Sequence, residues 1–236
     1  MAEIIEKKET TLEGATAIEA FPGVGLVGHI AGSYIISALD MEMIGYITSE
    51  NLPPLSIVYE GAVIPPLRIY THENLVLFIC DIPLPSEAVN EITTEIADFI
   101  EKKKVKQSLS LAGIGVGKQG EKVYAAATET KILDDLGMEP LKIGSIVGAS
   151  GSLLLECKRR DIPGIGLLAE TIGNVPDPRA SAMLVETLAD MMGFKIDIEP
   201  LLEEAEEVEE RFQQMMENLR RKEEAEGKGE YVPMYR

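Results

Sequence analysis

The fold is decided by residues 15–28, ATAIEAFPGVGLVG, where a short apolar run meets a glycine-rich turn. The run Ala15–Phe21 is typical of a buried strand, and Leu26–Leu39 has the pattern of an apolar helix. Pro22–Gly28 joins the two as a loop, and its glycines permit backbone conformations that other residues rarely adopt. A strand that turns sharply into a helix is the basic unit of an α/β sheet.

Three glycines of this turn, Gly23, Gly25 and Gly28, match the G-x-G-x-x-G pattern of dinucleotide-binding loops and are therefore candidate ligand-binding residues. The pattern also calls for an acidic residue about 20 positions further on, at the end of the second strand. The acidic residues near that position are poorly placed. The other interpretation is a tight strand–helix turn whose glycines allow close packing. Both interpretations stay open at this point.

Strand and helix patterns alternate from about Ala15 to Lys195. The further predicted strands are Met43–Ser49, Pro66–Thr71, Leu75–Cys80, Ser108–Ala112, Val123–Ala127, Leu141–Val147 and Gly164–Ala169, of which the second and third form a hairpin. The predicted helices are Glu87–Lys104 capped by Ser86, Thr130–Leu136, Leu153–Arg160 capped by Ser150 or Ser152, and Pro178–Met192 capped by Asp177. This alternation predicts an α/β fold, a three-layer α/β/α domain with a central, mostly parallel sheet covered by helices on both faces.

The composition changes at Asp197, since residues 197–236 hold 13 acidic and 6 basic residues. Apolar residues at alternating spacings of four and three give this part a heptad pattern, formed by Leu201, Ala205, Val208, Phe212, Met215 and Leu219. We expect an α/β domain over 1–196, an acidic heptad-patterned helix over 197–226 and a flexible tail over 227–236. The helix either lies on its own domain or packs as a coiled coil on another subunit.

The charge balance narrows the classes of partner. The net charge of −18 and the sequence pI near 4.5 argue against nucleic acid and against anionic membrane surfaces. Residues 1–11 are charged, and no apolar run approaches the roughly 18 residues of a membrane span, so we expect a cytoplasmic protein. Cys80 and Cys157 stand far apart in apolar surroundings and are expected to be buried free thiols.

Motifs for catalysis are weak throughout the chain. Gly113–Lys118 resembles a phosphate loop only superficially, because Ala112 and Gln119 stand where the motif needs glycine and a hydroxyl residue, so we expect a flexible loop after a strand there. His29 and His72 have no evident nucleophile partner, and no cluster has metal-ligand spacing. We therefore expect a protein that is not an enzyme and that needs neither metal nor cofactor.

Two segments together carry a family resemblance. They are Phe21–Gly28, and Glu170–Gly173 followed by Pro176–Ala180. In their order and strand contexts they resemble the proteasome assembly chaperone family, in its archaeal branch, over roughly residues 12–195. The resemblance implies an α/β protein that binds the proteasome.

The last three residues, Met234, Tyr235 and Arg236, are the predicted proteasome-binding residues. A hydrophobic residue, a tyrosine and a carboxylate at the end of a polar tail have the chemistry of a C-terminal docking peptide. They are similar to the hydrophobic–Tyr–any motif of proteasome activators. That similarity implies docking between adjacent α subunits of the proteasome core particle, capture of the carboxylate by a lysine, and a bias of the gate towards opening.

A single tail is expected to bind weakly, because ordering it costs entropy. Several tails on one homo-oligomer, with a tetramer favoured, gain effective concentration. The leading hypothesis is therefore an ATP-independent proteasome activator or assembly chaperone. The alternatives are a nucleotide- or nucleoside-binding enzyme that uses the Gly23–Gly28 loop, and a passive scaffold for free α subunits.

Overall fold

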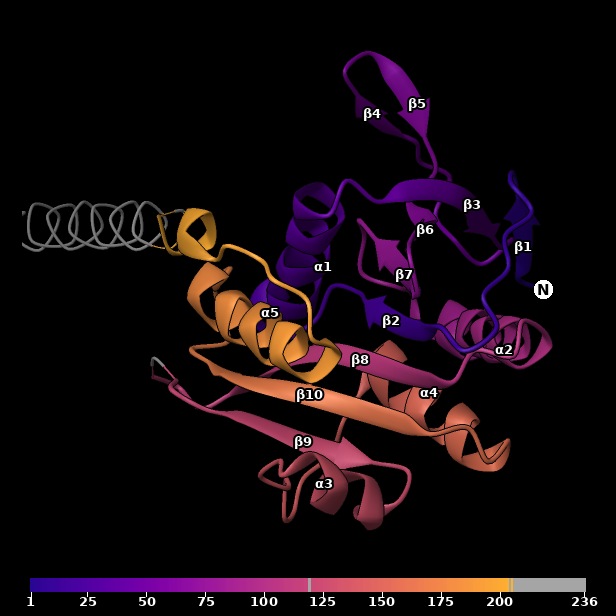
Figure 1. Ribbon diagram of the computed structural model, residues 1–236. Coiled ribbons are helices and arrows are strands. Elements are labelled where there is room, and N and C mark those ends of the chain that lie inside the picture. The colour runs from indigo at the N-terminus through magenta and orange to yellow at the C-terminus, as the bar shows by residue number, and fades with distance from the viewer. Residues whose placement is uncertain (119, 204, 206–236) are drawn as a thin grey trace, which may run out of the picture.

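A computed structural model describes residues 1–118, 120–203 and 205, which form a single large sheet with helices on both faces (Figure 1). The strands of this sheet are β1 (Glu3–Glu6), β2 (Thr16–Ala20), β3 (Glu42–Thr48), β6 (Leu67–His72), β7 (Leu75–Cys80), β8 (Gln107–Gly115), β9 (Val123–Ala127) and β10 (Gly164–Thr171). The α-helices are α1 (Val27–Ala38), α2 (Ser86–Lys102), α3 (Thr130–Leu136), α4 (Gly148–Arg159) and α5 (Pro178–Met192). The strand order is β1-β3-β6-β7-β2-β8-β10-β9.

The helices divide into two layers. Helices α1 and α5 lie side by side on one face of the sheet, and α2 packs against α4 on the other (Figure 1). Successive side chains of strand β7 point to opposite faces of the sheet. Leu77 joins the core beneath α1 and α5, whereas its neighbour Phe78 joins the core beneath α2. A strand buried on both faces must be apolar throughout, as β7 is. The predicted three-layer α/β/α architecture is confirmed.

The sheet is mixed, which corrects the expectation of a mostly parallel one. The four central strands β7, β2, β8 and β10 are parallel to one another. The flanking pairs β1–β3, β3–β6, β6–β7 and β9–β10 are antiparallel. The reason is local. Glu73 and Asn74 close the predicted β6–β7 hairpin, and a connection this short can join only antiparallel strands.

Helix α5 has the predicted bounds because its end signals are strong. Asp177 Oδ1 accepts a hydrogen bond from the Ala180 N–H at 2.9 Å, Pro178 opens the helix, and Gly193 ends it in a left-handed conformation with φ of 73°. Helix α3 ends in the same way at Gly137.

Two predicted caps and one predicted strand are wrong. Helix α2 begins at Ser86 itself, with Pro85 in the cap position. Helix α4 begins at Gly148, well before the predicted start, so Ser150 and Ser152 lie inside it. Residues 141–147 form no strand. Pairing with β9 in this region is limited to a bridge at Pro140, which lacks an N–H donor.

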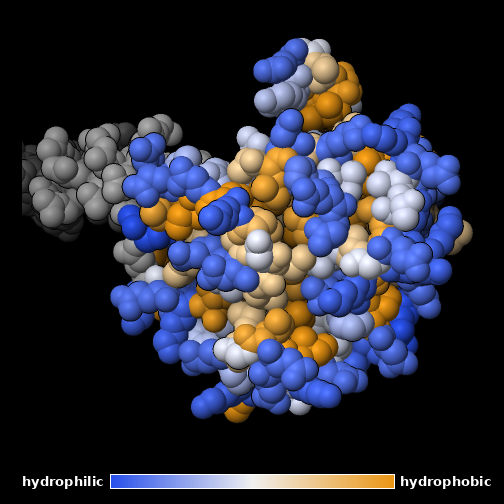
Figure 2. Space-filling view, viewed as in Figure 1, coloured by the Kyte–Doolittle hydropathy of each residue, from blue (hydrophilic) through white to orange (hydrophobic). Residues whose placement is uncertain are grey.

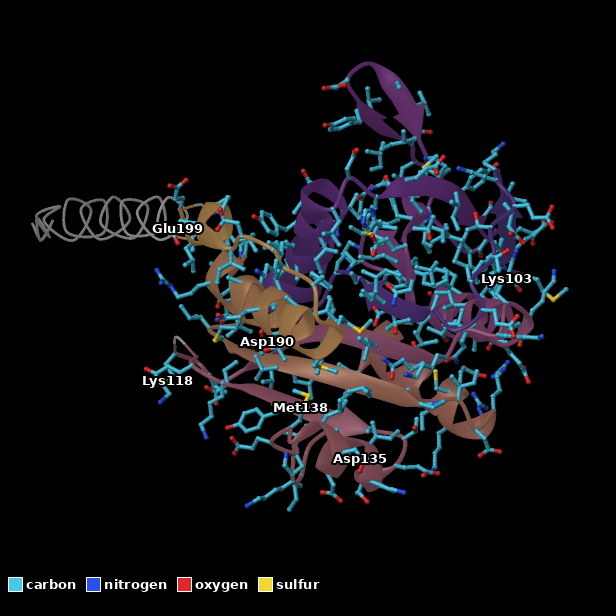
Figure 3. The ribbon with its side chains drawn as sticks, viewed as in Figure 1. Lys103, Lys118, Asp135, Met138, Asp190 and Glu199 are labelled. Atoms are coloured by element: carbon cyan, nitrogen blue, oxygen red, sulfur yellow. The ribbon has the colours of Figure 1, made fainter. Side chains whose placement is uncertain are left out.

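Two further elements are not evident from the sequence. Strand β1 pairs with β3 at the sheet edge, and the Lys103 ammonium at the end of α2 forms an ion pair with Glu6 of β1 at 2.6 Å (Figure 3). A second, two-stranded sheet, β4 (Ile57–Tyr59) and β5 (Ala62–Ile64), projects from the domain (Figure 1). Apolar side chains gather on this projection (Figure 2), where Val63 is 72% exposed.

The start of the acidic segment packs on the domain itself. Residues 199–203 are helical, and Leu201 is buried in the core shared with α1 and α5. Glu199 lies at the end of the domain where the described chain stops (Figure 3). The rest of the predicted helix and the tail lie outside the described residues. Within the described ranges, no helix is both long and apolar enough to cross a membrane.

Candidate functional site at the glycine turn

The glycine turn leaves β2 and passes through a 3-10 turn, η1 (Val24–Leu26), into α1. Gly25 adopts a left-handed conformation with φ of 64°. A Cβ atom at this position would stand 2.6 Å from Thr171 Oγ1. Both the backbone angle and the space therefore require glycine here.

The other two glycines differ from each other. A Cβ at Gly28 would stand 2.0 Å from the carbonyl oxygen of Leu111, so glycine lets α1 lie directly against β8. Gly23 is extended, and a Cβ built on it meets nothing within 4 Å. Gly25 and Gly28 thus have packing roles, whereas Gly23 borders open space.

Hydrogen bonds join this turn to the end of β10 and the start of α5. Thr171 Oγ1 donates to Asp177 Oδ2 at 2.7 Å, and the Asp177 N–H donates to the Gly25 carbonyl oxygen at 2.9 Å. Thr171 is fully buried. The two segments that carry the family resemblance therefore meet in space, although more than a hundred residues separate them.

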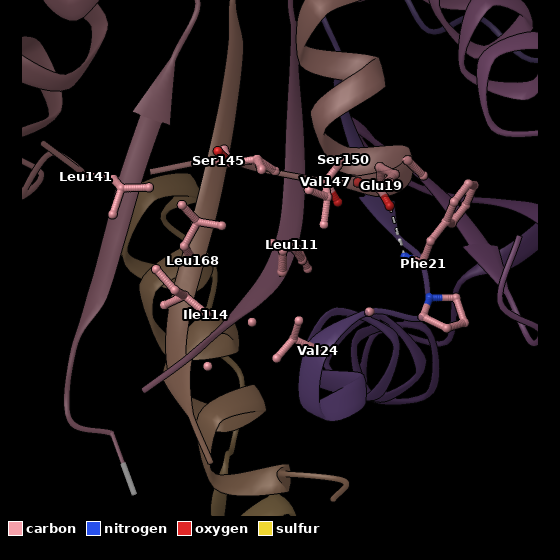
Figure 4. Close-up of a pocket in the computed structure, with 18 residues that line it drawn as sticks. Glu19, Phe21, Val24, Leu111, Ile114, Leu141, Ser145, Val147, Ser150 and Leu168 are labelled. Atoms are coloured by element: carbon pink, nitrogen blue, oxygen red, sulfur yellow. Dashed lines mark hydrogen bonds between the residues drawn. The ribbon is translucent and has the colours of Figure 1, made fainter. Parts of the chain in front are cut away.

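A cavity of about 390 Å³ lies beside the turn, at the carboxyl ends of β2 and β8 (Figure 4). The connection after β2 leads to β3 on one side of the pair, and the connection after β8 leads to β9, beyond β10, on the other. Ligands of open α/β sheets bind at such a switch point. The walls are mainly apolar, with side chains from Phe21, Val24, Leu111, Ile114, Val147 and Leu168.

Glu19 is the buried acidic group of this cavity. Its side chain is 1% exposed, and Oε1 accepts a hydrogen bond from the Phe21 N–H at 3.1 Å. Oε2 is buried and has no hydrogen-bond partner among the described residues. Burial raises the pKa of Glu19 to about 7, and the nearby Ser150 and Ser110 hydroxyls only partly oppose this shift. Near neutral pH, Glu19 is therefore poised between its protonated and ionised forms.

The start of α4 forms the opposite wall. Val147 occupies the N-cap position without a side-chain cap, and Gly148, Ala149 and Ser150 of the first turn line the cavity. The first N–H groups of a helix have no partner within it, and this end carries partial positive charge. No Lys, Arg or His is among the described residues that line the cavity.

Sequence reasoning missed this cavity, including Glu19 and the true place of Ser150. A usable signal was the single charged residue inside the apolar run Ala15–Phe21, because a charged group in a buried strand needs an explanation. The predicted loop after Ala112 is also corrected, because Gly113 to Gly115 continue strand β8.

The other predicted residues lie elsewhere. His29 sits on α1, where burial lowers its pKa, and His72 ends β6. Cys80 and Cys157 are buried and free, as predicted. Among the residues with described positions, no three His, Cys, Asp or Glu side chains are grouped to hold a metal ion. Met234, Tyr235 and Arg236 lie outside the described residues.

The model of the PAC2 family matches residues 17–216, which include the whole glycine turn and the Thr171–Asp177 pair. The chain belongs to the PAC2 family. Among solved structures, this PAC2 protein is similar to Pyrococcus furiosus PbaA, an archaeal homolog of proteasome-assembly chaperone. The two are 42% identical with a TM-score of 0.84, over 98% of this chain and 99% of PbaA. The predicted resemblance to archaeal proteasome assembly chaperone homologues is confirmed.

Two further likenesses complete the comparison. Pyrococcus furiosus PbaB, an archaeal proteasome activator, shares the fold of this PAC2 protein with a TM-score of 0.82, 24% identity, and coverage of 91% of this chain and 98% of PbaB. An uncharacterised protein of Methanocaldococcus jannaschii is 36% identical over 215 residues, 90% of each chain.

Proposed function

We propose that this PAC2 protein is an ATP-independent proteasome-binding protein, an activator or assembly chaperone of the core particle. In this proposal it works in the cytoplasm as a homo-oligomer, for which a tetramer is favoured, and it is not an enzyme. Its tail docks into pockets between α subunits and promotes gate opening. The likeness to PbaA over nearly the whole of both chains is the observation that carries the proposal.

The proposed docking group is Met234, Tyr235 and the carboxylate of Arg236, with Arg236 taken as the carboxyl terminus. Tyr235 supplies a rigid apolar ring with a polar tip. The carboxylate pairs with a cation in a partly desolvated pocket, where charge-assisted hydrogen bonds are strongest. Pro233 restricts the preceding residue and reduces the entropy lost on docking. We propose that the chain is divided into an α/β domain over 1–196, a helix over 197–226 and a tail over 227–236. In this division the helix and the tail carry the docking group away from the α/β domain.

The geometry of the glycine turn supports an ATP-independent role. In a dinucleotide-binding loop, glycine lets the pyrophosphate approach the backbone. In this protein, side-chain and backbone atoms of Thr171 and Leu111 occupy the space beside Gly25 and Gly28. A thermal-shift screen with NAD, ATP and nucleosides tests the enzyme alternative. A saturable shift that disappears in a folded Gly25→Val variant would favour that alternative over our proposal.

The tail provides its own matched control, because Tyr231 stands four residues before Tyr235. We expect Tyr235→Ala and deletion of residues 234–236 to abolish co-sedimentation with the core particle and stimulation of peptide hydrolysis. Tyr231→Ala should retain both. One alanine added after Arg236 keeps every side chain but moves the carboxylate, and it should also abolish docking.

Unchanged binding and hydrolysis in the truncated protein would refute the tail mechanism. Loss of hydrolysis with retained binding to free α subunits would instead support the passive scaffold. Light scattering on the intact protein tests the expected tetramer.

A further inference from the structure

Glu19 lowers the stability of the folded protein at the buried position where it lies. A buried polar atom without a hydrogen-bond partner destabilises a protein, and Oε2 of Glu19 is such an atom. The hydroxyl of its strand neighbour Ser110 is also buried, and although it lies near enough to Glu19 to oppose the rise in its pKa, it makes no hydrogen bond of regular geometry. An apolar side chain at position 19 of β2 could be buried with a smaller loss of stability. The presence of a glutamate at this buried position therefore indicates a role other than packing.

The surroundings of Glu19 indicate what kind of group it would bind. Its Oε1 is held by the Phe21 N–H, so Oε2 is the oxygen left to interact with a ligand (Figure 4). The uncapped first turn of α4 also lines the cavity and offers N–H donors. The cavity thus combines a hydrogen-bond acceptor on β2 with donors on α4, between apolar walls.

We propose that this cavity binds a small neutral molecule with an apolar body and a carboxamide or lactam group. The amide N–H donates to Glu19 Oε2, and the amide carbonyl accepts from the first-turn N–H groups of α4. The apolar body packs against Val24, Leu111 and Leu168. This site is separate from the proposed tail docking, and its test does not depend on the proteasome.

Charged ligands fit this site less well. A carboxylate would face Glu19, with no lining Lys, Arg or His among the described residues to neutralise it. A cation would pair with an ionised Glu19, but it would leave the first-turn N–H groups of α4 without an acceptor and would face the positive end of that helix. An amide carries a donor and an acceptor without net charge. The volume of about 390 Å³ lies within the roughly 300–1,000 Å³ typical of small-molecule sites.

Three probes with one ring test the proposal: benzamide, benzoate and benzamidine. Their affinities are measured by ligand-observed NMR or calorimetry at pH 8, where a group with a pKa of about 7 is mostly ionised. We expect saturable binding of benzamide, at least tenfold tighter than that of benzoate or benzamidine.

Glu19→Gln is the decisive variant, since the Phe21 N–H fixes the side-chain oxygen at the Oε1 position. The glutamine NH2 then replaces Oε2 and presents a donor where the ligand needs an acceptor. Benzamide should bind at least tenfold more weakly, while benzoate should bind more tightly. Glu170→Gln changes a glutamate that does not line the cavity, and it should leave both affinities unchanged.

Gly23→Leu gives a steric test, since the new side chain has open space at the cavity wall and the extended backbone accepts it. We expect this variant to fold and to lose benzamide binding. The proposal is overturned if folded wild-type protein does not bind benzamide saturably, or if it prefers benzoate. It is equally overturned if Glu19→Gln leaves the order of affinities unchanged, whether or not Gly23→Leu folds.

Discussion

The hydroxyl of Thr171 donates a hydrogen bond to Asp177 Oδ2 at 2.7 Å and fixes the end of β10 to the cap of α5. The same aspartate caps the helix through Oδ1 and donates its N–H to Gly25. Asp177 thus couples a strand and a helix through its side chain and the glycine turn through its backbone N–H.

Thr171→Val keeps the shape of this side chain and removes its hydrogen bond to Asp177, together with the one that the hydroxyl accepts from the Gly173 N–H at 3.2 Å. Because Asp177 Oδ2 then loses its buried partner, we expect a loss of about 1–3 kcal/mol in the free energy of unfolding. Asp177→Ala also removes the helix cap and should cost about 1 kcal/mol more. Denaturant unfolding measures both. Thr48→Val, at an exposed strand position, should change little, and equal effects at the two threonines would contradict this account.

The three glycines of the turn should respond unequally to alanine. Gly25→Ala forces a left-handed conformation and a contact with Thr171, so we expect a loss of at least about 1–2 kcal/mol. Gly28→Ala pushes α1 off β8 and should reduce the yield of folded protein most. Gly23→Ala has open space and should be nearly neutral. Melting temperatures and soluble yields give the order, and a large effect at Gly23 would be inconsistent with it.

The raised pKa of Glu19 makes stability depend on pH. Between about pH 4.5 and 7 the unfolded chain ionises this group, while the folded protein keeps its proton. The contribution of protonated Glu19 to the free energy of unfolding is therefore fully present below pH 4.5 and is lost as the pH rises through 7. Glu19→Gln cannot ionise, so its stability relative to wild type should rise over this range, on the order of 3 kcal/mol.

Denaturant unfolding of both proteins from pH 4.5 to pH 8.5 measures that difference. His29 is present in both proteins, so its own titration should largely cancel in the comparison. A difference that does not change with pH would show that Glu19 has an ordinary pKa in the folded state.

The two cysteines should be nearly inert in the folded protein. Burial raises the pKa of the Cys80 thiol to about 11 and also raises that of Cys157, so little thiolate is present at neutral pH. We expect Ellman's reagent to label neither thiol over minutes in buffer and to label both at once in denaturant. Rapid labelling of one thiol in buffer would reveal local opening around it.

Local signals account for the elements that were predicted well. Asp177, Pro178 and Gly193 mark the ends of α5 in the sequence itself, and Gly137 marks the end of α3. The start of α4 gave a misleading signal, because its first turn contains glycine, which is a poor helix former, and serine, which is typical of caps. Gly151 is needed there because a Cβ would stand 2.1 Å from the carbonyl oxygen of Ile146, in the chain that leads into the helix. Close packing of this kind has no counterpart in local sequence patterns.

The same limit applies to the cavity. Glu19 and Ser150 come together only because α4 covers the sheet at the end of β2. The sequence shows an acid within an apolar strand, but it does not show which distant helix lies over it. The G-x-G-x-x-G pattern located the right turn, although two of its glycines serve packing and only Gly23 borders the cavity.

The central position of β2 has a consequence for synthesis on the ribosome. Its pairing partners, β7 and β8, both come later in the chain, and β8 ends at Gly115. Until residue 115 has left the exit tunnel, a nascent chain exposes one edge of β2, a strand whose residues are all buried in the folded protein. Fragments that end before that point should be the aggregation-prone ones, and ribosome-stalled chains should gain protease resistance only beyond it.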